Sequence, residues 1–555
     1  MLSVTSIQLS LGQLDSDVRT AAARADEAAA ALWRRDASLW SRDTDVQKKI
    51  ANRLGWLDSP RMLADSIDRL RTFADGIRRL GFTDVVLLGM GGSSLAPEVL
   101  RSTVGVADGW PRFHMLDSTD PAAVRGAATT PERTLYILAS KSGGTIEPKS
   151  LAAHFRARLE SAGINDWATH FIAITDEGTA LAARARDERF RDLFINPSDI
   201  GGRYSALSFF GMVPAALMGQ DVNVLVSRGQ AMLAAAMATS SSLDNPAVAL
   251  GLAMGSAAKA GRDKLTLLLP DRFASFGLWV EQLVAESTGK SGVGIVPIAG
   301  EPVGASSVYG DDRLFVDMRG PSAARLTPSV AIEWNDPLDV SAEFVRWEIA
   351  TAIAGALLGI NPFDEPNVQQ AKDATNKLLA SFTSQGALPS SPPGTTLAGG
   401  IELTANSAAK SALGAGNAVA LLKLLKSGDY FSQLAYVSPS ADVVEELERL
   451  REVVRDRARV ATTIGIGPRY LHSTGQLHKG GPDSGVFLLI TTGAAEDVNI
   501  PGQPYTFGTL ERAQALGDFA SLDAAKRRAV HAHLPYATPQ LARALVDELI
   551  AAMSS

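Results

Sequence analysis

The stretch 87–100, "LLGMGGSSLAPEVL", ends a run of aliphatic residues in a turn that holds three glycines and two serines. The pattern predicts a strand at 85–88, a turn at 89–93 and a helix from about Ser94. Backbone N–H groups at such a turn, together with the start of a helix, can bind an anion. The candidate ligand residues are Gly91, Gly92 and Ser93. A tight turn without a ligand explains this stretch alone about as well.

A second turn of the same kind lies at 135–151, "LYILASKSGGTIEPKSL". An apolar strand is followed by Ser140, Lys141, Ser142, two glycines and Thr145, and then by a helix. Because ligands of open parallel sheets bind at the carboxyl ends of the strands, we expect both turns to face one site. The hydroxyl-rich loop suits a monophosphate. The alternative is a helix capped by a serine.

Short apolar runs alternate with helical patterns through most of the chain, which is typical of parallel sheets covered on both faces. The runs are "DVVLLG", "RFHMLD", "TLYILAS" and "HFIAIT", and, after a helical region at 205–260, "KLTLLLP", "VGIVPI", "RLFVDM" and "SVAIEW". "QLAYVS" and "VFLLIT" follow a Pro/Gly/Ser-rich stretch at 390–400, and a terminal pair of helices closes the chain. A chain of 555 residues exceeds one hydrophobic core, so we expect two or three domains.

Composition excludes several classes of protein. The net charge is −7, from 53 basic and 60 acidic residues, and no long basic stretch suggests nucleic acid. The absence of cysteine excludes disulfides, thiolate zinc sites and a cysteine nucleophile. We see neither a signal peptide nor an apolar run long enough for a membrane span, and we therefore expect a cytoplasmic protein.

Five segments, in order, resemble the sugar-isomerase family and, more narrowly, the phosphoglucose isomerase family. They are "GMGGSSLAP" (89–97), "SKSGGT" (140–145), "IGGRYSALSFFG" (200–211), "EQLVAESTGKSGVGIVP" (281–297) and "LLGINPFDEPNVQQAK" (357–372). The resemblance runs from roughly residue 50 to 372. The later segment "GPRYLHSTGQLHKGGP" (467–482) looks like the isomerase half of fused transaldolase–phosphoglucose isomerase proteins, without a transaldolase half here.

The resemblance implies an α/β fold with two sugar-isomerase-type doubly wound parallel-sheet domains and helical N-terminal and C-terminal segments. We expect a helical N-terminal arm at 1–60 and a first, phosphate-binding domain at 61–235. A second domain is expected at 236–395, and a C-terminal segment at 396–555 that completes it.

The activity implied is the reversible isomerisation of glucose 6-phosphate and fructose 6-phosphate through an enediolate, a step of glycolysis and gluconeogenesis. Glu286 matches the family's proton-transfer base. Arg203 matches the arginine that steadies the enediolate oxygen, for which a fixed guanidinium is well suited. Lys372 matches a lysine that assists ring opening. No metal and no organic cofactor is implied.

The histidine that opens the sugar ring is the least regular part of the pattern. The family places it between the base and the "NPFD" segment, where this chain has none, and His472 stands in a similar motif after that segment. In the family a neighbouring subunit supplies this residue, so His472 implies a homodimer. Glu365 and Gln369 also depart from the family's Gln and Glu. A carboxylate at 365 would repel a phosphate unless Lys141 or Lys372 paired with it.

Three other readings stay open. The chemistry could extend to other sugar phosphates, including mannose 6-phosphate. The chain could be a non-catalytic sugar-phosphate-binding module, although Glu286, Arg203 and Lys372 together disfavour this. It could also be a dinucleotide-dependent oxidoreductase that binds the ribose with Asp117. His531 and His533 are expected on different faces of a helix and are therefore not a metal pair.

Overall fold

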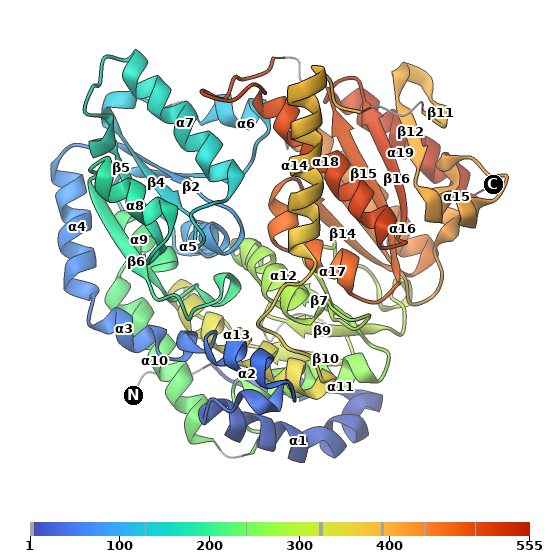
Figure 1. Ribbon diagram of the computed structural model, residues 1–555. Coiled ribbons are helices and arrows are strands. Elements are labelled where there is room, and N and C mark those ends of the chain that lie inside the picture. The colour runs from blue at the N-terminus through green and yellow to red at the C-terminus, as the bar shows by residue number, and fades with distance from the viewer. Residues whose placement is uncertain are drawn as a thin grey trace.

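This computed structural model describes residues 5–127, 129–239, 241–320, 323, 326–389, 393–437, 440–493 and 496–554. They form a mixed α/β fold with three sheets, all of them largely parallel (Figure 1). Within these residues, no helix combines the length and the apolar character needed to cross a membrane. The expected α/β class with parallel sheets and helical segments is confirmed.

The first sheet is fully parallel and has the strand order β3-β2-β4-β5-β6. Every residue of the central strands β2 and β4 is buried, which explains their unbroken apolar runs. The strands are β2 (Asp84–Leu88), β3 (Arg112–Leu116), β4 (Thr134–Ala139), β5 (Phe171–Asp176) and β6 (Asp192–Asn196). The accompanying helices are α4 (Ile67–Arg79), α5 (Leu95–Thr103), α6 (Pro121–Gly126), α7 (Ile146–Ser161), α8 (Ala180–Asp187) and α9 (Phe209–Leu217).

The second sheet has the order β1-β10-β9-β7-β8 and takes one strand from the N-terminal arm. Most of this arm is helical as expected, but β1 (Ile7–Ser10) pairs antiparallel with the edge strand β10, and Ile7 and Leu9 pack against the core. The four-residue alternation "IQLS" is too short to be recognised as a strand without its partner. The other strands are β7 (Lys264–Leu268), β8 (Val296–Ile298), β9 (Arg313–Asp317) and β10 (Ser329–Ile332). The helices of this region are α1 (Asp15–Trp33), α2 (Thr44–Ala51), α3 (Ser59–Ala64), α10 (Val222–Ala238), α11 (Val248–Lys259), α12 (Ala274–Thr288) and α13 (Val340–Leu358).

The C-terminal segment forms a sheet of its own, with the order β11-β12-β16-β15-β13-β14, whereas we expected it to complete the second domain. Its helices and strands also enclose a separate hydrophobic core, which includes Leu450, Leu488 and Val530. The strands are β11 (Thr395–Thr396), β12 (Glu402–Ala405), β13 (Tyr430–Tyr436), β14 (Ala461–Ile466), β15 (Gly485–Thr492) and β16 (Arg528–Leu534). The helices are α14 (Val368–Gln385), α15 (Ser407–Leu413), α16 (Ala441–Ala458), α17 (Gly475–Gly480), α18 (Phe507–Ala524) and α19 (Pro539–Ser554). The expected terminal pair of helices is therefore interrupted by β16.

Helix α12 lies between the first and the third sheet and contacts both α5 and α17 (Figure 1). A buried ion pair joins the second sheet to the third: Arg313 of β9 donates to Glu301 at 2.9 Å, and the backbone N–H of Thr462 in β14 donates to the same carboxylate at 2.8 Å. The three sheets thus meet around α12, whose last turn carries Glu286.

Candidate active site

A pocket of about 520 Å³ opens at the carboxyl edge of the first sheet. Six of the expected substrate-binding residues line it: Gly92, Ser93, Ser140, Lys141, Ser142 and Thr145. The pocket also contains residues that the sequence did not point to, among them Arg53, Asp176 and Ser198. The two turns therefore face one cavity, as expected for neighbouring strands β2 and β4.

Helices α5 and α7 both begin at this cavity, and neither start is capped by a side chain. Helix starts without such a cap favour an anionic ligand. The turn before α5 lies close against the segment that carries Arg203: a Cβ added to Gly92 would lie 2.1 Å from the carbonyl oxygen of Gly202. Glycine at position 92 is a requirement of this contact.

Gly91 is not in the pocket wall but lies directly behind it. Its φ is +54°, and an added Cβ would lie 2.7 Å from the carbonyl oxygen of His472. This glycine therefore lets the turn approach the backbone of the C-terminal segment. Lys141 is already paired with Asp176 and donates to the carbonyl oxygen of Ser198 at 3.1 Å.

Arg203 is buried beside the pocket and donates hydrogen bonds to four residues. It is 4% exposed and donates to Ser287 Oγ at 2.8 Å and to the carbonyl oxygens of Pro362 and Asp364 at 2.8 and 2.9 Å. Its Nη1 lies 2.9 Å from Glu365 and 3.5 Å from Glu286. The guanidinium is thus shared between two carboxylates.

Glu286 is 8% exposed and stands behind Arg203 and Glu365, outside the pocket wall itself. Burial raises the pKa of this carboxyl to about 7, although the Arg203 guanidinium acts in the opposite direction. Glu365 adds to the rise through its negative charge. A carboxyl with a pKa near 7 can both accept and return a proton at neutral pH.

Glu365 lines the pocket, and its side chain is 46% exposed. We expected a carboxylate here to need Lys141 or Lys372 as its partner, but Arg203 fills that role. Burial raises the pKa of Glu365, yet the guanidinium outweighs it and the pKa ends below its usual value.

His472 reaches the site from its own chain, between β14 and α17. Its Nε2 lies 2.8 Å from Glu147 Oε1, and its carbonyl oxygen accepts a hydrogen bond of 2.7 Å from Gln282. Gln514 of α18 donates to the same Glu147 oxygen at 2.6 Å. Burial opposes ionisation of Glu147, but the charge and hydrogen bond of His472 keep the pKa of this carboxyl low. His472 and Glu147 thus meet within one chain, and the homodimer stays a prediction from the sequence.

The structure does not place Lys372 in contact with Glu286, Arg203 or His472. It is exposed on α14, and none of the described contacts of Glu286, Arg203 or His472 includes it. A different lysine is closer: Lys290 is buried, donates to Asp364 Oδ1 at 2.7 Å and influences the pKa of Glu286. It follows Glu286 by four residues, within the segment 281–297.

Two further expectations change. Asp117 forms two bonds with Arg469, at 2.7 and 2.8 Å, so it is not available as a ribose ligand. His531 and His533 lie on strand β16 and not on a helix, so they share a face, and both contact Thr491 Oγ1, at 2.8 and 2.9 Å.

The fold and site define a largely parallel α/β protein with a pocket at the carboxyl edge of its first sheet, a buried carboxyl with a pKa of about 7 and a buried arginine beside it. Residues 61–311 match the model of a family described as phosphoglucose isomerase. A glucose-6-phosphate isomerase of Synechococcus sp. (strain JA-2-3B'a(2-13)) is 32% identical over 259 residues, which cover 42% of this chain and 48% of the relative. One of Citrifermentans bemidjiense is 27% identical over 356 residues, which cover 54% of this chain and 66% of the relative. The matches therefore span about half to two thirds of these relatives.

Among solved structures, a glucose-6-phosphate isomerase from Chlamydia trachomatis aligns over 64% of this chain and 78% of its own, with a TM-score of 0.49 and 19% identity. A protein from Thermus thermophilus, described only as hypothetical, aligns over 99% of this chain and 93% of its own, with a TM-score of 0.45 and 19% identity.

Proposed function

We propose that this protein catalyses the reversible isomerisation of glucose 6-phosphate and fructose 6-phosphate. The observation that carries the proposal is Glu286, a buried carboxyl with a pKa of about 7, placed 3.5 Å from Arg203 behind a pocket formed by two hydroxyl-rich loops. The match of residues 61–311 to the phosphoglucose isomerase model, and the names of the relatives, support the same reaction.

In this proposal the phosphate binds to the starts of α5 and α7, with hydroxyl donors from Ser140, Ser142 and Thr145. The sugar chain then points toward Glu365, which moves aside so that Arg203 and Glu286 face carbons 1 and 2. Glu286 takes a proton from one carbon and returns it to the other, and Arg203 stabilises the negative oxygen of the enediolate. His472, oriented by Glu147, transfers the proton that opens the sugar ring. Lys372 has no place in this scheme unless α14 shifts.

The direct test is a coupled assay in which fructose 6-phosphate is supplied and glucose 6-phosphate is detected. We expect wild-type turnover, and we expect Glu286→Gln to lower kcat by about two to four orders of magnitude, the usual contribution of a general base. Substrate binding, measured by titration calorimetry, should persist in the variant, because Glu286 lies outside the pocket wall. Normal turnover by Glu286→Gln would refute its assignment as the base.

The same assay and titration, repeated with mannose 6-phosphate, separate the other candidates. A non-catalytic binding module would bind the sugar phosphate without turnover in the wild-type chain. A broader isomerase would also convert mannose 6-phosphate. The likeness of residues 467–482 to transaldolase fusions, a homodimer and a cytoplasmic location remain predictions from the sequence.

A further inference from the structure

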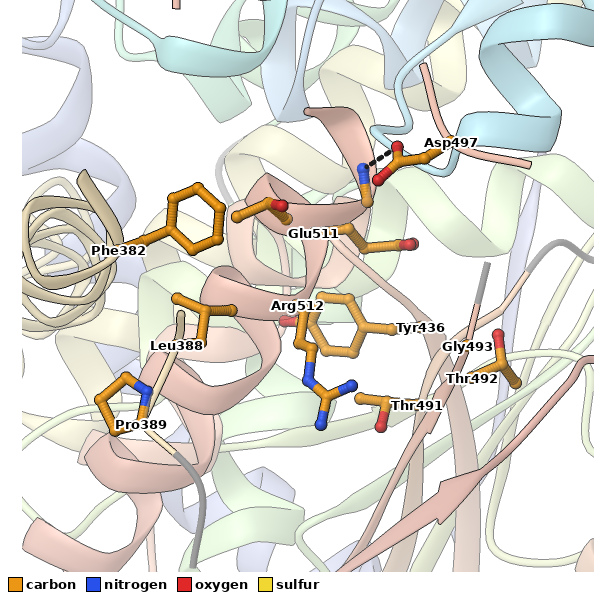
Figure 2. A pocket seen from close by; sticks show the side chains of 12 residues that line it. Phe382, Leu388, Pro389, Tyr436, Thr491, Thr492, Gly493, Asp497, Glu511 and Arg512 are labelled. Carbon is orange, nitrogen blue, oxygen red and sulfur yellow. Dashed lines mark hydrogen bonds between the residues drawn. The ribbon is translucent and has the colours of Figure 1, made fainter. Parts of the chain in front are cut away.

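A second cavity, of about 350 Å³, lies in the third sheet and shares no residue with the first pocket (Figure 2). Its wall comes from the ends of β13 and β15, from the first turns of α18 and from the end of α14 with the residues after it. The lining residues are Phe382, Leu388, Pro389, Tyr436, Thr491, Thr492, Gly493, Asp497, Gly508, Thr509, Glu511 and Arg512. Its volume falls within the range of about 300–1,000 Å³ typical of small-molecule sites.

The cavity occupies the position in a parallel sheet where ligands usually bind. From β13 the chain passes through α16 to β14 on one side, and from β15 it passes through α18 to β16 on the other side. The direction of the connections therefore reverses between the neighbours β13 and β15. A crevice forms at the carboxyl ends of two such strands, and Tyr436 and Thr491 stand at those ends.

Among the described residues, none bonds to the buried Oε1 of Glu511 in this crevice. Glu511 is 8% exposed. Burial and the nearby charges of Asp120 and Asp497 raise its pKa well above the usual value. A buried polar oxygen without a donor is costly, so a ligand hydroxyl that bonds to it is favoured.

Arg512, the next residue, supplies the positive charge. It is exposed, and in Figure 2 its guanidinium extends from α18 toward the end of β15, where Thr491 lies. Its Nη1 lies 3.5 Å from His533 Nε2, and no carboxylate pairs with it among the described residues. An unpaired guanidinium at the mouth of a cavity suits a single carboxylate or phosphate group.

The start of α18 does not act as the anion site. Thr506 Oγ1 accepts from the N–H of Thr509 at 3.2 Å, and Asp497 accepts from the N–H of Gly508 at 2.9 Å. These two bonds occupy backbone N–H groups of the first turn of α18. The residue before α7, by contrast, forms no side-chain cap. A nucleotide diphosphate, which needs such N–H groups, is therefore disfavoured. The rest of the wall combines threonine hydroxyls with the apolar surfaces of Phe382, Leu388 and Pro389.

We propose that this cavity binds a monosaccharide-sized polyol carrying one anionic group, either a sugar acid or a sugar phosphate. The anion pairs with Arg512, the hydroxyls bond to Glu511 and Thr492, and the carbon skeleton lies against Phe382 and Leu388. This site is separate from the proposed isomerase site and does not depend on it.

The test uses the full-length chain and three probes: D-gluconate, α-D-glucose 1-phosphate and D-glucose. Neither of the anionic probes has a carbonyl at carbon 1 or 2 that an aldose–ketose isomerase could use, so binding is measured without turnover. Titration calorimetry compares the wild type with Arg512→Gln, Lys526→Gln and Ser140→Ala. Lys526 follows the other end of α18 and is exposed, so its variant removes the same charge away from the cavity.

We expect at least one anionic probe to bind, with D-glucose binding much more weakly. Arg512→Gln should weaken the anionic probe by about tenfold or more, the scale of one charged hydrogen bond, whereas Lys526→Gln and Ser140→Ala should leave it unchanged. Thr492→Val, which removes a hydroxyl and no charge, should also weaken it. If Ser140→Ala weakens binding of the anionic probe and Arg512→Gln does not, the probe binds in the first pocket and the proposal is overturned. Absence of binding by both anionic probes at millimolar concentration would overturn it as well.

Discussion

Arg203 stands between two carboxylates, and the nearer of them is Glu365, at 2.9 Å against 3.5 Å for Glu286. Glu365 accepts a hydrogen bond from the guanidinium and lines the pocket, whereas Glu286 is not part of the pocket wall. It also adds negative charge beside Glu286 and so contributes to its high pKa. A glutamate at position 365, in place of glutamine, therefore raises the pKa of the proposed base Glu286.

The pH profile of the proposed isomerase should report this arrangement. Glu286 must be ionised to accept a proton, and its pKa is about 7, so kcat/KM should rise with pH through that value. Glu365→Gln removes a charge that raises the pKa of Glu286, so the rising limb should move to lower pH. Profiles of kcat/KM against pH for both proteins measure the shift.

A suitable control is Glu132→Gln, which removes an exposed carboxylate at the opposite edge of the first sheet, before β4. Glu132→Gln should leave the rising limb of the kcat/KM profile at the same pH as in the wild type. A limb that stays fixed or moves upward in Glu365→Gln would contradict the coupling between the two carboxylates.

At the scale of elements, the sequence predicts local features such as strands and turns. It does not predict contacts between residues that are far apart in the chain. The turns at 89–93 and 140–145 can be predicted because strand, turn and helix follow one another within about twenty residues. The partner of Glu365 lies 162 positions away and that of His472 lies 325 positions away, so neither contact leaves a local signal. The sequence analysis predicts a helix for His531 and His533 because "RAVHAHL" stands between two long helices. Its alternation of small apolar and polar residues indicates a strand in retrospect.

The contact between the two glycine turns makes a prediction about stability. Gly92→Ala places a Cβ 2.1 Å from the carbonyl oxygen of Gly202, so one of the turns must shift. We expect a loss of about 2–4 kcal/mol in the free energy of unfolding, the scale of a buried steric conflict, together with a large loss of substrate binding. Chemical denaturation and titration calorimetry measure the two effects.

Gly76→Ala, in the interior of α4, provides the matched control. No atom of the described residues lies within 4 Å of an added Cβ there, and alanine favours a helix by about 0.5–1 kcal/mol. This variant should gain stability and keep its binding. Equal behaviour of the two variants would remove the steric argument for Gly92.

For the molecule as a whole, the C-terminal unit has its own sheet and core but is joined to the second sheet through buried charge. Arg313 of β9 is 1% exposed and binds Glu301, which also accepts hydrogen bonds of 2.8 and 2.7 Å from the backbone and side chain of Thr462. Arg313 also donates to the carbonyl oxygen of Val460 at 3.2 Å. One ion pair thus connects two sheets.

Breaking this pair from one side should be costly, because it leaves a buried carboxylate without its cation. We expect Arg313→Met to lower the free energy of unfolding by about 3 kcal/mol, as measured by denaturant titration. The double variant Arg313→Met with Glu301→Leu should recover part of the loss, because both charges are then absent. A double variant less stable than Arg313→Met would show that the charge is not the cause.

In the proposed site, His472 and Glu286 come from the same polypeptide, and this has a consequence for mixing experiments. If histidines were exchanged between subunits, a sample of Glu286→Gln chains combined with His472→Ala chains would regain activity, because hybrid assemblies would contain some intact sites. With both residues supplied in cis, every hybrid carries one defect per catalytic centre. We therefore expect such mixtures to be no more active than the sum of their components, whatever assembly the chains form.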